Sequence, residues 1–146
     1  YAHLPSRAAL QLLRSRLVPP GAHLAFASVR HTIVYLQRAA ASTRRIANEP
    51  ALLTALGRAA SAGGASIRLL SDAPALRLTD AMQLLARAAC VVGVHGAGWA
   101  NLIFGPPGAH VVEMALSEPH AIYTAHLAYA LDMEYHLVPL RGAALH

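Results

Sequence analysis

A glycine-rich turn, His95-Gly96-Ala97-Gly98, directly follows an apolar run that ends at Val94. The run predicts a buried strand and the residues after the turn predict a helix, so the turn lies where N–H groups and a helix dipole favour an anion. Glycines let the backbone bend and come close to a pyrophosphate, and His95 can donate a hydrogen bond to a phosphate oxygen. These residues predict a phosphate-binding turn, with a purely structural turn as the alternative.

Two other uses of such a turn fit the sequence less well. A dinucleotide-binding fingerprint needs a third glycine at position 101, where this chain has Asn101. An esterase oxyanion loop needs a Gly-x-Ser-x-Gly nucleophile elbow, which the sequence lacks. Glu113 lies in the apolar segment "VVEM", where an unpaired carboxylate is costly to bury, so we expect it to bind a ribose.

Apolar strand-like runs alternate with helical patterns on both sides of the turn. Strands are predicted at residues 31–38, 65–71, 90–94, 110–115 and 134–140. Helices are predicted at residues 5–18, 48–62, 78–89, 99–104 and 119–132, the first with Leu10, Leu13 and Leu17 on one face. This alternation predicts an α/β fold, a doubly wound and mostly parallel sheet with helices on both faces.

The stretch "VVGVHGAGWANLIFGPPGAHVVEM" resembles glycosyltransferase family 61. Members commonly carry Gly-Val-His-Gly-Ala-Gly-Leu-Thr-Asn, then Leu-Phe, Pro-Pro-Gly-Ala and Val-Val-Glu. The resemblance extends in order from about residue 32 to residue 139, through "YLQR", "RRIANE", "LTDAMQLLARAAC" and "YTAHLAYALDMEYHLVP". Trp99 and Ala100 stand where members usually have Leu and Thr.

The resemblance implies the Rossmann-like C-terminal half of a GT-B glycosyltransferase. Residues 1–30 would then be an N-terminal helix and a linker to a missing upstream domain, and residues 31–146 the domain that binds a nucleotide sugar. The resemblance also implies an inverting enzyme that transfers GlcNAc or xylose from a UDP-sugar to a glycoprotein or glycan without a metal. It implies that this enzyme acts in the lumen of the endoplasmic reticulum or Golgi. The catalytic base is expected on the missing N-terminal domain, so no catalytic residue is assigned here.

The same resemblance extends the set of residues expected to bind the donor. Arg38 and Arg45 match basic positions of the family, and a guanidinium can bind diphosphate oxygens in a bidentate way. Asn101, in the first turn of the next helix, would add a hydrogen-bond donor. The full predicted donor site is His95, Gly96, Ala97, Gly98, Asn101, Glu113, Arg38 and Arg45.

Composition limits the partners of this 146-residue chain, whose formal net charge is +5. All twelve basic residues are arginines and they are dispersed, without the clustered stripe that binds nucleic acid. No apolar stretch reaches the length of a membrane span, so we expect no membrane contact by this segment itself. Its one cysteine, Cys90, excludes an internal disulfide.

Four histidines were compared for metal-ligand spacing: His110, His120, His126 and His136. The intervals between them are not those of metal ligands, so we interpret these four histidines as surface or packing residues. We expect neither a metal nor a cofactor. A non-catalytic nucleotide-binding α/β module remains the alternative to a sugar-transferring half-enzyme.

Overall fold

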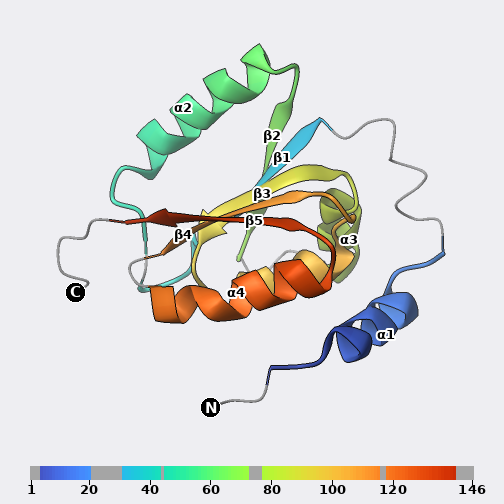
Figure 1. The fold of residues 1–146 in the computed structure, drawn as a ribbon. Coiled ribbons are helices and arrows are strands. Elements are labelled where there is room, and N and C mark those ends of the chain that lie inside the picture. Colours follow the sequence, from blue (N-terminus) through green and yellow to red (C-terminus); the bar gives the residue numbers. More distant parts are fainter. Residues whose placement is uncertain (1–3, 21–30, 44, 73–76, 116–117, 141–146) are drawn as a thin grey trace.

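A single parallel sheet organises the computed structural model, which describes residues 4–20, 31–43, 45–72, 77–115 and 118–140. Its five strands lie in the order β2-β1-β3-β4-β5 (Figure 1). They are β1 (Thr32–Gln37), β2 (Ser66–Ser71), β3 (Ala88–Val94), β4 (His110–Ala115) and β5 (Glu134–Pro139). Every pairing is parallel, so the predicted α/β class is confirmed and the sheet is more uniform than the mostly parallel one expected.

The strand order contains one point where the chain reverses its direction across the sheet. From β1 the chain moves outward to β2, then returns past β1 to β3 and continues in the other direction to β4 and β5. Open parallel sheets bind their ligands at such a point, outside the carboxyl ends of the strands. In this chain that place lies between the ends of β1 and β3.

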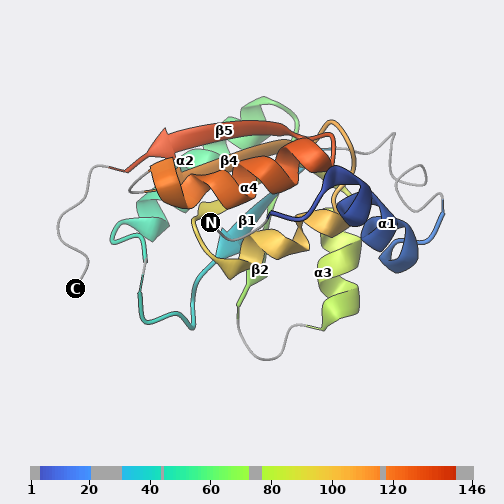
Figure 2. The same cartoon turned by 60° about the horizontal axis from the view of Figure 1, so that its bottom comes forward.

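Helices cover both faces of the sheet, as predicted, but unequally. The helix α2 (Glu49–Ala62) lies on one face, and the second face carries α1 (Arg7–Leu17), α3 (Leu78–Leu85), the 3-10 helix η2 (Ala97–Phe104) and α4 (Glu118–Ala130) (Figures 1 and 2). Each face has its own buried cluster, the larger one being on the second face. None of the described helices has both the length and the apolar character needed to cross a membrane.

Two predicted boundaries differ from the structure at the ends of β3. The helix predicted to reach residue 89 ends at Leu85, and β3 begins at Ala88, because Ala88 already pairs with Thr32 of β1. The short helix predicted at residues 99–104 begins at Ala97 and is a 3-10 helix. Periodicity alone cannot divide a continuous apolar run between a helix and a strand, and strand pairing decides it.

The predicted apolar face of the first helix is only partly correct. Leu10 is buried, but Leu13 and Leu17 are 48% and 42% exposed, and Arg14 is buried instead. The Arg14 guanidinium donates to the backbone oxygens of Leu131 and Gly105. A charged side chain can occupy this position because carbonyl oxygens satisfy its N–H groups.

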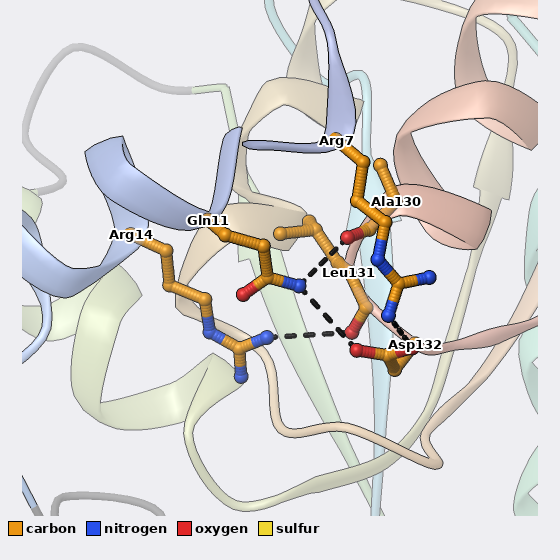
Figure 3. Close-up of polar contacts among 6 residues, drawn as sticks. All are labelled: Arg7, Gln11, Arg14, Ala130, Leu131 and Asp132. Carbon is orange, nitrogen blue, oxygen red and sulfur yellow. Dashed lines mark hydrogen bonds and ion pairs between the residues drawn. The ribbon is translucent and has the colours of Figure 1, made fainter. Parts of the chain in front are cut away.

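Polar side chains of α1 bind the turn between α4 and β5 (Figure 3). Gln11 donates to the Ala130 oxygen and Arg7 forms an ion pair with Asp132, which has a positive φ of 61°. The helix α1 therefore belongs to the packed unit that also contains α4 and η2. The domain boundary predicted after residue 30 stays a prediction, since residues 21–30 lie outside the described ones.

Replacement of Arg14 by alanine should lower the free energy of unfolding by about 2–3 kcal/mol, because two buried carbonyl oxygens lose a charged donor. Arg16 lies on the exposed side of the same helix, so Arg16→Ala should change it by less than about 0.5 kcal/mol. Urea denaturation of both variants measures the difference. Equal stability of the two variants would show that α1 is not held by Arg14.

Candidate functional site

Two adjoining cavities open at the carboxyl edge of the sheet, where β1 and β3 end. The larger has a volume of about 290 Å³ and lies between these strand ends and the start of α2. The smaller, of about 110 Å³, lies between the ends of β1 and β2 and the turn after β3. Arg38, the residue directly after β1, lines both cavities. The point of chain reversal and the cavities therefore coincide.

The Arg38 side chain lies against the turn at Gly96. A Cβ on Gly96 would be 2.1 Å from Arg38 Nη1, so any larger residue would displace the guanidinium. Arg38 Nε is buried and has no hydrogen-bond partner among the described residues. Buried polar atoms are nearly always hydrogen-bonded in proteins, so this nitrogen has room for a partner from outside the described residues, a water or an anion.

The physical reason for the glycines differs from the one expected from the sequence. Gly96 has a φ of 167°, which is extended backbone that any residue adopts, and among the described glycines only Gly64 and Gly108 lie in the left-handed region. Gly96 is therefore required for the close approach of Arg38 rather than for a sharp bend. At Gly98 the nearest atom to an added Cβ is 4.0 Å away, so Gly98 is not required by packing within the chain.

His95 is held by a buried carboxylate. Its Nδ1 lies 2.8 Å from Glu113 Oε1, and Glu113 is completely buried. The same oxygen accepts a hydrogen bond from the Thr124 hydroxyl, and Oε2 accepts one of 2.7 Å from the Tyr135 hydroxyl. This contact fixes the orientation of the His95 ring.

This network connects four elements on one face of the sheet. Glu113 lies in β4, Thr124 in α4 and Tyr135 in β5, while His95 follows β3. Burial, with the hydrogen bond to Glu113 as a second cause, raises the pKa of the Tyr135 hydroxyl, which therefore stays a donor. The backbone N–H of His95 donates to the Met114 oxygen and continues the sheet. The turn is thus anchored through both the backbone and the side chain of His95.

The predicted site residues fall into two groups. Arg38, Gly96, Gly98 and Asn101 line the smaller cavity together, and Arg45 lines the larger one with Arg38. Asn101 Nδ2 donates to the Gly98 oxygen. Ala97 is exposed at the start of η2.

Glu113 is placed differently from the other predicted residues. Its carboxylate is enclosed, and both oxygens accept from side chains of this chain. The ribose contact expected of Glu113 stays a prediction. The observed contacts support another role for Glu113, the positioning of His95.

Further polar residues line the cavities and were not singled out from the sequence, among them Gln37, Glu49 and Asp72. Glu49, in the first turn of α2, accepts from the Tyr35 hydroxyl and from Gln37 Nε2. Asp72 Oδ1 accepts from the backbone N–H of Ala40. The available signal was their position, since Gln37 ends β1 and Asp72 directly follows β2, at the edge where ligands bind.

The fold and the site together define a class of protein, a parallel α/β domain with cavities lined by arginine where the chain reverses. A family model described as glycosyltransferase 61 matches residues 3–112, which is 110 of the 146 residues. The chain belongs to this glycosyltransferase family, and the resemblance drawn from its motifs is confirmed. A search of curated proteins gave no match. Family membership implies a transferase that uses a nucleotide sugar and an acceptor.

Variants that remove hydrogen bonds of Glu113 should lower the free energy of unfolding in proportion to the number of bonds lost. Thr124→Val removes one buried hydrogen bond and should cost about 1 kcal/mol, while Glu113→Ala removes the acceptor of three groups and should cost about 3 kcal/mol. Thr54→Val, on the exposed side of α2, is the matched control and should cost less than about 0.5 kcal/mol. Denaturant unfolding gives all three values, and equal values for the two Thr→Val variants would contradict this role of Glu113.

Proposed function

We propose that this chain is the donor-binding, C-terminal half of an inverting glycosyltransferase of GT-B architecture that uses a UDP-sugar. The observation that carries the proposal is Arg38, whose buried Nε lacks a partner among the described residues at the cavity where β1 and β3 end. A diphosphate oxygen is the acceptor that such a guanidinium binds best. Membership of glycosyltransferase family 61 supports a nucleotide sugar as the source of that diphosphate.

In the proposed reaction, a hydroxyl oxygen of the acceptor attacks the anomeric carbon of the donor sugar from the face opposite the diphosphate. The bond between that carbon and the β-phosphate oxygen breaks, and UDP leaves with the electron pair. A base takes the proton of the acceptor hydroxyl, and we propose that this base lies on an N-terminal domain. Negative charge grows on the β-phosphate during this step, so groups that bind it there accelerate the reaction.

Three groups of this chain are proposed to neutralise the leaving diphosphate. Arg38 supplies a fixed positive charge, and the amides of the Gly96–Gly98 turn supply N–H donors at the start of η2. His95, held through Nδ1 by Glu113, donates from its other nitrogen when the ring is charged. These groups replace a metal ion, so we propose that donor binding is metal-independent.

The ribose contact expected of Glu113 stays a prediction, and a cavity-lining carboxylate is proposed as a further ribose ligand. Glu49 lines the larger cavity, and Tyr35 and Gln37 fix its orientation. Arg45 lines the same cavity and is proposed to contact the diphosphate from the side of α2. The donor sugar is proposed to be GlcNAc or xylose and the acceptor a glycoprotein or glycan of the endoplasmic reticulum or Golgi, on the basis of the family resemblance.

UDP and UDP-sugars should stabilise the chain against heat more than NAD, ATP or GDP do. A ligand at 100 times its dissociation constant adds about 2.7 kcal/mol to the free energy of unfolding, which a thermal-shift assay detects as a higher Tm. Stabilisation by NAD equal to that by UDP would contradict the proposal. Stabilisation by UDP without any sugar transfer by the longer protein would favour the non-catalytic module.

The same assay in the presence of a chelator is the control for the metal. The Tm shift with UDP should be unchanged by EDTA, since the proposed donor site binds the diphosphate with arginine, histidine and backbone N–H groups. A loss of the shift in EDTA would overturn metal-independent binding.

Arg38→Met should weaken the binding of UDP by about 1.5–3 kcal/mol, the range for a hydrogen bond to a charged group. The binding of uridine should be unaffected. Gly96→Ala should have the same effect, because its Cβ would occupy the position of Arg38 Nη1. Arg58→Met, on the exposed side of α2, is the matched control. Titration calorimetry with UDP and uridine gives the affinities, and equal weakening of both ligands by Arg38→Met would show that Arg38 does not bind the diphosphate.

A further inference from the structure

Three side chains of types that can bind a metal meet on adjacent strands, at the amino ends of β4 and β5. This edge of the sheet is opposite the edge that holds the two cavities. His110 is the first residue of β4 and Glu134 the first residue of β5, and the two are paired in register. His136 lies two residues after Glu134, so both project from the same face of β5. These three residues are the group among the described side chains whose ligand atoms all lie within 4.8 Å of one another.

The distances between the ligand atoms fit a small metal ion. His110 Nδ1 lies 3.2 Å from His136 Nε2 and 3.3 Å from Glu134 Oε2. In a tetrahedral zinc site with bonds of about 2.0–2.1 Å, neighbouring ligand atoms are about 3.3 Å apart. Two of the three edges of such a site are therefore already formed. Glu134 is 64% exposed and can rotate to close the third.

The two imidazole rings lie side by side on the neighbouring strands. They stack with centroids 5.5 Å apart and an interplanar angle of 29°, and His110 Nδ1 faces His136 Nε2. An imidazole nitrogen without a proton is a metal ligand. One ion placed beside these two nitrogens would therefore contact both rings.

We propose that His110, Glu134 and His136 form a zinc site with a water molecule in the fourth position. Two imidazoles and one carboxylate select zinc over magnesium or calcium, which prefer oxygen ligands alone. All three side chains are exposed, so the ion has a direct path from solvent and an open coordination position. The strands, rather than loops, fix the spacing of the ligands.

The proposed zinc site is separate from the donor site. It lies at the amino ends of β4 and β5, whereas Arg38 and the turn at Gly96 lie at the carboxyl edge of the sheet. The ion would link β4 to β5 through side chains, in addition to the backbone hydrogen bonds. It takes no part in the proposed sugar transfer, which stays metal-independent.

Zinc binding is tested on the full 146-residue chain, freed of any histidine tag, by competition with a chromophoric zinc chelator. We expect one tight site per chain, weakened at least about tenfold by His110→Ala, His136→Ala or Glu134→Gln. His126→Ala, on α4 at the other face of the sheet, is the matched control and should leave the affinity unchanged. Because the three ligands are exposed, circular dichroism should show an intact fold in every variant.

A second measurement distinguishes a built site from loose binding to surface histidines. Co²⁺ in place of zinc should give the intense visible absorption of tetrahedral coordination, and this absorption should disappear in His110→Ala. UDP affinity should be the same with and without zinc. Zinc affinity that is equal in the wild type and all three ligand variants, or only the weak spectrum of octahedral Co²⁺, would overturn the proposal.

Discussion

The hydrogen-bond network of the buried Glu113 carboxylate is the interaction on which the arrangement of the proposed donor site depends. A carboxylate with no exposed surface is tolerated only when its oxygens are satisfied, and here His95, Thr124 and Tyr135 satisfy them. Because these partners come from the turn after β3, from α4 and from β5, one charge fixes the relative positions of three segments. The orientation of His95, and with it the shape of the glycine-rich turn, follows from this network.

The close contact between Arg38 and Gly96 connects that turn to the strand next to it. The absence of a side chain at Gly96 leaves room for the guanidinium, which in turn lines both cavities. A positive charge is thereby placed between two strand ends, beside the first turn of α2 and the start of η2. The guanidinium and the start of η2 both attract an anion, and by our proposal that anion is the diphosphate of a nucleotide sugar.

The unequal covering of the sheet gives its two faces different roles. The face that carries α1, α3, η2 and α4 holds the larger core and the buried polar groups Arg14 and Glu113. On the other face, α2 packs near β2, and the first residues of β4 and β5 present exposed histidines and a glutamate. By our two proposals, side chains on the same parallel sheet bind an anion at one edge and a cation at the other.

The sequence alone determined the class of fold and the family, because both depend on local patterns. Apolar runs alternating with helical periodicity specify parallel strands with helices between them. The motifs from "YLQR" to the Pro-Pro-Gly turn indicate glycosyltransferase family 61, whose model matches residues 3–112. The approximate limits of all five strands followed from the same patterns. The predicted position of the turn after β3 needed no more than its glycines and the apolar run before it.

Only the tertiary structure decided which side chains meet. The burial of Arg14 in place of Leu13 depends on carbonyl oxygens of residues more than ninety positions away, which no helical period reveals. The partners of Glu113 come from the turn after β3, from α4 and from β5, and the cluster of His110, Glu134 and His136 arises from the pairing of β4 with β5. Spacing along the chain gave no sign of either group. Sequence patterns report the periodicity of one element, whereas a site is made of side chains that different elements bring together in space.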